Sequence, residues 1–180
     1  MTNPAVISQM NGAPRELNQA ASSTTETVFT TDGTIPVVLP LPTAAQLGGP
    51  NRSSMFRVRA WGMVSTAASL TFDVRLYYGT STTVADNTLL VDSGTITIAT
   101  TTTNWSIWAD LVWDGNSDVI NGRGGANVHL TSSGGTGYLM NQVTSADPDG
   151  DATRGFVVSG QFGTGNVGNT ARLSGMQIVL

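Results

Sequence analysis

The stretch between Phe56 and Tyr78 constrains the fold most, because every second residue is apolar in two successive runs. The apolar positions are Phe56, Val58, Ala60 and Val64 in the first run and Leu70, Phe72, Val74 and Leu76 in the second. A period of two is that of a β-strand with one apolar and one solvent-facing side. Because only small and polar residues separate the runs, the pattern predicts a β-hairpin whose apolar face lies on a core.

Further short apolar runs follow, separated by turns rich in Gly and Thr. The strongest covers 105–113 and has apolar odd positions, namely Trp105, Ile107, Ala109, Leu111 and Trp113. Other predicted strands are 28–31 and 34–39 around the turn Asp32-Gly33, 88–92, 95–99, 119–120, 128–130, 138–140, 155–162 and 171–180. No run has the period of an amphipathic helix. The sequence therefore predicts an all-β fold, a β-sandwich or jelly roll of about eight to ten strands.

The chain divides into two parts by composition. Residues 1–26 are rich in Asn, Ala, Ser and Thr and show no lasting periodicity, so we expect an extended N-terminal arm that can lie over a neighbouring subunit. Residues 27–180 are expected to form a single β-sandwich or jelly-roll domain, which is long enough for one core. Neither a secretory signal nor an apolar run of the ~20 residues that a membrane helix needs is present, so no membrane contact is expected.

The charge pattern limits the classes of partner. Only 11% of the residues are charged, against about 25% in an ordinary soluble domain. All eight basic residues are Arg, the net charge is −4, and no basic cluster provides the cationic surface that nucleic-acid binding requires. A polar but weakly charged surface favours packing against other proteins.

Catalytic and metal-binding signatures are missing from the sequence. The absence of Cys excludes thiol chemistry, and the single histidine, His129, excludes sites built from several histidines. His129 falls in an apolar run and no nucleophile-elbow motif is present, so we interpret it as structural and expect no catalytic residue and no cofactor. Two acidic turns, 114–118 and 147–151, place oxygen ligands at alternate positions as calcium loops do, but they lack the later ligands and suit ordinary turns. We therefore assign no metal site to them.

The aromatic and arginine residues indicate a candidate protein interface. Trp105 and Trp113 share the core register, whereas Trp61 and Trp108 occupy the opposite register of their strands. The hairpin prediction places three arginines on the outward face with Trp61, so the candidate interface residues are Arg57, Arg59, Trp61, Arg75 and Trp108. Trp and Arg are the residue types that anchor protein interfaces. Two alternatives remain open: a platform for sugar rings, and a solvated sheet face with cross-strand charge pairs.

The order of these runs resembles that of a known class of proteins. The relevant segments are FRVRAWGMV (56–64), SLTFDVRLYYGT (69–80), NTLL (87–90), TTNWSIWADLVWD (102–114), GFVVSGQFG (155–163) and a terminal apolar strand. Together they resemble the jelly-roll virion proteins of tailed bacteriophages, particularly the decoration or cement proteins of capsids, over about residues 50–180. Similar patterns occur in the tail-fibre and head-fibre domains of phages. The resemblance implies no enzyme activity, a homotrimer on the outer capsid surface of the virion, and the major capsid protein as partner.

Three hypotheses for function follow. The first is a non-enzymatic cement protein that stabilises the assembled phage head. The second is a carbohydrate-binding receptor module of a tail or head fibre, which would use Trp61 or Trp108 and the acidic loops. The third is a hydrolase, which the scarcity of His, Cys and Glu disfavours.

Overall fold

The computed structural model of the chain describes residues 6–17, 24–31, 34–42, 46, 53–66, 69–98, 102–114, 119–129, 143–144, 154–166 and 168–180. Nearly all of the secondary structure is β-strand, and the one helical element among the described residues is a single 3₁₀ turn, η1 (Val84–Asp86). In this part of the chain no helix has the length and apolarity to cross a membrane. The predicted strand at 138–140 and the acidic turns 115–118 and 147–151 lie outside the described residues.

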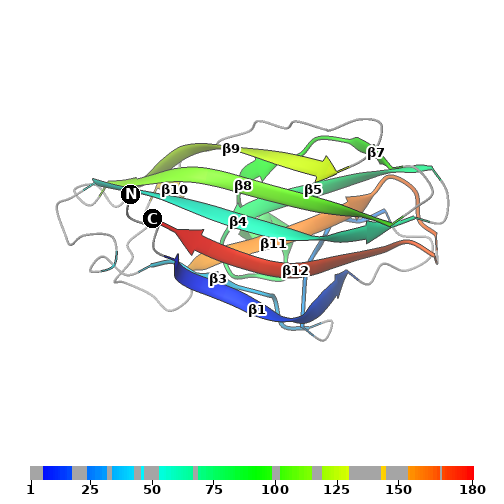
Figure 1. Ribbon diagram of the computed structural model, residues 1–180, viewed down its shortest axis with the longest axis horizontal. Helices are drawn as coiled ribbons and strands as arrows, with labels where there is room; N and C mark the ends of the chain where they lie inside the picture. Colours follow the sequence, from blue (N-terminus) through cyan, green and yellow to red (C-terminus); the bar gives the residue numbers. More distant parts are fainter. Residues whose placement is uncertain are drawn as a thin grey trace.

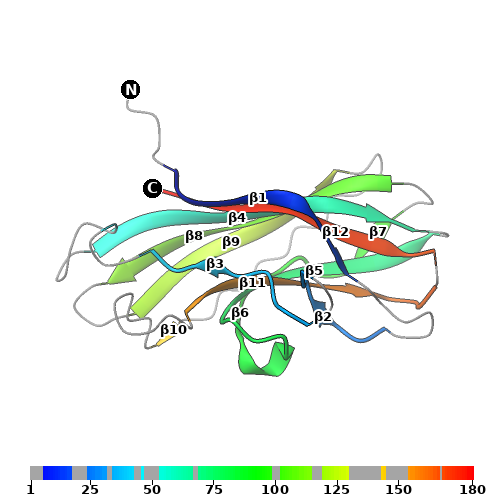
Figure 2. The ribbon, with the colours of Figure 1, turned by 90° about the horizontal axis from the view of Figure 1, so that it is seen from below.

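Two antiparallel sheets pack against each other (Figures 1 and 2). The larger sheet has the order β1 (Val6–Leu17), β12 (Thr170–Val179), β4 (Ser53–Ser65), β8 (Thr102–Asp114), β9 (Val119–His129) and β10 (Val143–Thr144). The smaller sheet has the order β2 (Thr27–Val28), β11 (Gly155–Phe162), β5 (Leu70–Tyr78) and β6 (Thr88–Asp92), with β3 (Leu39–Pro40) also beside β11 and β7 (Ile96–Ile98) also beside β5. The predicted all-β sandwich is confirmed.

The order in which the strands pair is nested. β1 pairs with β12, β2 with β11, β4 with β8, and β5 with β6, so early strands meet late ones and the innermost pair lies in mid-chain. This nesting is the strand order of a jelly roll, in which a long folded ribbon closes into two facing sheets. β9 and β10 extend the larger sheet beyond β8.

The predicted hairpin between Phe56 and Tyr78 is wrong, although its faces are right. β4 pairs with β12 and β8, whereas β5 lies in the other sheet and pairs with β11, β6 and β7. The apolar positions of both strands still point inward, and Phe56, Val58, Phe72 and Val74 are fully buried. The alternation determines which face is buried but not which strand lies alongside, so two facing strands and a hairpin give the same pattern.

Aromatic side chains fill the space between the sheets. Trp105 and Trp113 are each 1% exposed, as expected for core residues. Ring contacts join the two sheets: Phe29 stacks on Trp105 at 5.7 Å between centroids, and Phe56 meets Phe156 edge-on at 6.2 Å. Such pairs add about 0.5–1.5 kcal/mol each beyond the area that they bury.

A β-bulge in β12 changes which residues face the core. Ala171 and Leu173 point inward before it, and Met176 and Ile178 point inward after it, with the register shift between Leu173 and Gly175. The predicted strand 171–180 includes Leu180, but β12 ends at Val179 and Leu180 is 43% exposed. The extra residue of a bulge is what moves the apolar phase from odd to even positions.

The N-terminal segment is partly a strand. Residues 6–17 form β1, which pairs along β12 at the edge of the larger sheet. Its use as an arm that reaches a neighbouring subunit stays a prediction. The reversal predicted around Asp32-Gly33 is present in its described part, since Thr30 and Pro36 form a bridge and Val37 N donates to Phe29 O at 2.9 Å.

Candidate protein-binding surface

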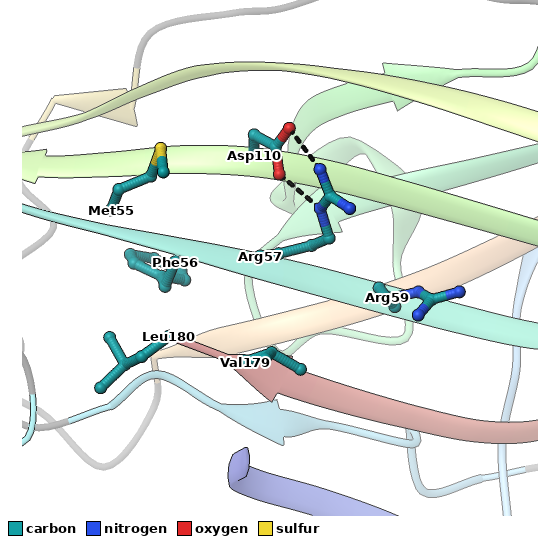
Figure 3. A pocket seen from close by; sticks show the side chains of 7 residues that line it. All are labelled: Met55, Phe56, Arg57, Arg59, Asp110, Val179 and Leu180. Carbon is teal, nitrogen blue, oxygen red and sulfur yellow. Dashed lines mark hydrogen bonds and ion pairs between the residues drawn. The ribbon is translucent and has the colours of Figure 1, made fainter. Parts of the chain in front are cut away.

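The outer face of the larger sheet brings together four of the predicted interface residues. Arg57, Arg59 and Trp61 alternate along β4, and Trp108 comes from β8 next to it. In the register of the two strands, Arg59 lies opposite Trp108 and Arg57 lies opposite Asp110. The side chains of these strands therefore form one continuous outer surface, part of which is shown in Figure 3.

Arg57 is the centre of this surface and has two fixed contacts. Its Nε donates to Asp110 Oδ1 at 2.5 Å and its Nη2 donates to Asp110 Oδ2 at 2.8 Å, which is a bidentate ion pair (Figure 3). The guanidinium carbon also lies 5.0 Å from the centroid of the Trp108 ring. The hydrogen bond to Asp110 raises the pKa of Arg57 above its ordinary value, so the group is charged at any physiological pH. The pair orients Arg57 and adds little stability, because half of the side chain is exposed.

Trp61 lies flat over a glycine of the neighbouring strand. A Cβ on Gly175 would stand 2.5 Å from Cζ2 of Trp61, so only Gly leaves room for the ring to cover the strand there. Trp61 is half-buried as a result. Both outward tryptophans thus have one ring face occupied, Trp61 by Gly175 and Trp108 by Arg57.

Arg75 does not belong to this surface, which corrects the predicted set. Because β5 lies in the smaller sheet, Arg75 points out of the opposite side of the sandwich. There it donates to Asp92 Oδ2 at 2.8 Å and to Asp73 Oδ2 at 3.0 Å, and it pairs with Glu26 Oε2 at 3.0 Å. Its Nη1 also donates to Gln161 Oε1 at 2.9 Å. With the Arg75 side chain only 14% exposed, this cluster is a structural network rather than a free contact patch.

Glu26 ties the N-terminal segment to the smaller sheet. Tyr77 Oη donates to Glu26 Oε1 at 2.7 Å, and Ser159 Oγ donates to the same oxygen. Burial and the hydrogen bond to Glu26 raise the pKa of Tyr77 well above its ordinary value, so the phenol stays protonated and remains a donor. Gln161 Nε2 adds a bond to Thr24 O at 2.8 Å.

Exposed apolar side chains complete the outer face of the larger sheet. They are Met55 (69% exposed), Met63 (43%), Val112 (38%) and Leu180. Met55 and Val112 lie directly opposite each other on β4 and β8, so they form one cross-strand apolar pair beside Asp110. The sequence analysis did not name these residues as interface candidates, although Met63 and Val112 occupy outward positions of predicted strands.

Two shallow depressions of about 300 Å³ each lie on this face. The first, shown in Figure 3, is lined by Met55, Phe56, Arg57, Arg59, Asp110, Val179 and Leu180. The second is lined by Met63, Val64, Ser65, Thr102, Thr170 and Arg172. Their volume is at the lower end of the range for small-molecule sites.

The described residues of this face combine arginines with exposed apolar side chains. No group of three or more metal-ligating side chains occurs among them. His129 lies in β9 with its backbone opposite Asn104, and its predicted structural role stays a prediction. We found no match to the chain among protein-family models, curated proteins or solved structures.

Proposed function

We propose that this chain is a non-enzymatic structural protein that binds another protein through the outer face of its larger sheet. The observation that carries the proposal is the joint exposure of Arg57, Trp108, Met55, Met63 and Val112 on one sheet face. Arg, Trp and Met are enriched at protein interfaces, and solvent-facing sheets of free proteins ordinarily carry polar residues there. The rigid sandwich behind them holds the contact residues in place before binding.

Within this class we propose a capsid decoration protein of a tailed phage, located on the outer surface of the head and bound to the major capsid protein. The support is the resemblance of the strand order together with the low charge and this contact face. A cement protein binds the assembled shell and not its free subunits, so it stabilises the shell by mass action. A homotrimer would present three such faces, and their avidity would increase the occupancy on the shell.

The test mixes the purified chain with shells assembled from the major capsid protein encoded in the same genome. We expect the chain to sediment with the shells at a fixed ratio. Replacing a central interface residue costs about 2 kcal/mol or more, so Arg57→Gln should weaken binding about thirtyfold. The matched control is Thr97→Glu, which changes the charge by the same amount on exposed Thr97 of the smaller sheet. A chain that does not sediment with shells, or equal effects of the two variants, would contradict the proposal.

A carbohydrate-binding receptor module of a phage fibre is the second candidate. The observation in its favour is that Trp108 is partly exposed beside the ion pair of Arg57 and Asp110, a setting that suits a sugar ring. A glycan array separates the two candidates. Saturable sugar binding that Trp108→Ala abolishes would favour the receptor module over the cement protein.

A further inference from the structure

We propose that the depression around Met55, Arg59 and Leu180 takes one extended segment of a partner protein, in which a carboxylate side chain adjoins a bulky apolar one. The inference rests on the proposed function, since it names the element of the partner that this sheet face would recognise. It is derived from the distribution of charge and apolar surface within the depression.

The apolar side of the depression is formed by exposed side chains from two strands. Met55 projects from β4 and Leu180 follows the end of β12, and the two are 69% and 43% exposed. In Figure 3 both lie at the left of the view, Met55 above and Leu180 below Phe56, with Val179 to the right of Leu180. An apolar side chain of a partner would bury this surface, and a volume of about 300 Å³ holds one or two large side chains.

The polar side holds a cation, Arg59, that has no counterion among the described residues. One guanidinium edge of Arg57, formed by Nε and Nη2, is occupied by the carboxylate of Asp110. By contrast, no hydrogen bond or ion pair to the Arg59 side chain is found among the residues that the structure describes, and Figure 3 shows its guanidinium turned away from Asp110. The side chains of the lining include two arginines and one aspartate, a side-chain charge of +1 in a chain whose net side-chain charge is −4.

Charge complementarity therefore selects an anionic group beside the apolar one. An Arg guanidinium binds a carboxylate through two parallel hydrogen bonds, which fixes orientation as well as adding energy. The carboxylate would meet Arg59, and the neighbouring apolar side chain would contact Met55 and Leu180.

The test uses defined peptides with the full-length chain labelled for NMR at the methionine methyls and arginine Nε. The probe is acetyl-Gly-Ser-Leu-Glu-Ser-Gly-amide, and its control has Gln in place of Glu. We expect saturable shifts at the Met55 methyl and the Arg59 Nε–H, with a dissociation constant on the order of 1 mM for so small a ligand. The Gln peptide should bind at least about tenfold more weakly, because it lacks the charge.

Two variants locate the site. Arg59→Gln should remove the preference for the Glu peptide without changing the melting temperature, because Arg59 has no ion pair with any residue that the structure describes. Arg172→Gln, the same change at the second depression, should leave peptide binding unchanged. Shifts that are equal for both peptides, or that survive Arg59→Gln, would overturn the inference.

The outcomes also separate this inference from the proposed function. If shell binding depends on Arg57 but not on Arg59, and the peptides do not bind, the inference is overturned and the proposed function is unaffected. If the peptide binds but the chain does not attach to shells, the peptide site is supported and the proposed cement function is rejected. Concentration-dependent self-association that Arg59→Glu abolishes would replace the partner segment by a second copy.

Discussion

Replacing Arg75 by Met should test how far a charge cluster supports the smaller sheet. The substitution keeps a long apolar stem and removes the guanidinium, which leaves the carboxylates of Glu26, Asp73 and Asp92 without their common cation. Arg75 has four polar partners at 2.8–3.0 Å, which are these three carboxylates and Gln161. Breaking a buried ion pair costs about 3–5 kcal/mol.

The expected loss lies at the lower end of that range. The side chains of the three carboxylates are 17–26% exposed, so water partly rehydrates them once the cation is gone. We therefore expect the free energy of unfolding to fall by about 3 kcal/mol at pH 7. Arg57→Met is the matched control, because that arginine also holds a carboxylate but is half exposed, and its loss should cost under about 1 kcal/mol.

The assay is urea unfolding followed by tryptophan fluorescence, with the free energy extrapolated to water. A double-mutant cycle measures the interaction between Arg75 and Asp73 separately. In the Arg75→Met chain, Asp73→Asn should restore about 1 kcal/mol more than the same change gains in the wild-type chain, because it also removes one of the charges left unpaired. The reasoning is refuted if Arg75→Met costs no more than Arg57→Met, or if Asp73→Asn gains no more there than in the wild-type chain.

Three further predictions concern the core tryptophans, Asp73 and Gly175. Trp105→Phe should destabilise the fold about 1–3 kcal/mol more than Trp113→Phe, because Trp105 Nε1 donates to a backbone carbonyl at 3.2 Å whereas Trp113 Nε1 is buried without a partner among the described residues; equal urea midpoints for the two variants would contradict this. Burial raises the pKa of Asp73 above its ordinary value, so the free energy of unfolding falls as the pH rises from the ordinary pKa to the raised one. Asp73→Asn removes this loss and should gain up to about 1 kcal/mol relative to wild type between pH 4 and pH 7. A difference in stability between the two chains that does not change with pH, measured by urea unfolding, would argue against it. Gly175→Ala should lift the Trp61 ring from the sheet, visible as a shift of its indole N–H resonance with little loss of stability, and an unmoved resonance would show that the ring is not held there.

Much of the fold follows from the sequence because alternation reports burial directly. The positions predicted to face inward in β4, β5 and β8 are all buried except Leu70, which is partly buried, and they include Trp105 and Trp113. The pairing of strands was not, since hydrogen bonds between backbones carry no side-chain signal. β4 and β5 are consecutive in the chain yet belong to different sheets, and a few intervening residues serve either connection.

The candidate site shows the same limit. Arg57, Arg59, Trp61 and Trp108 share a face because each occupies an outward position of a strand in the larger sheet. Arg75 has the same local pattern and was placed with them, but the separation of the sheets puts it on the other side. The Met55–Val112 pair depends on the register of β4 against β8, which a single strand pattern does not contain.

The antiparallel pairing of β1 with β12 has a mechanical consequence. Val6 lies opposite Val179, so the outer ends of the two strands meet at one pole of the sandwich (Figure 2). A load applied between those ends would act across the ladder and open its hydrogen bonds one after another, at low force. A load on β4 and β8 directed along the strands would instead have to shear the whole ladder at once. The domain should therefore yield first at its edge while the central strands stay closed.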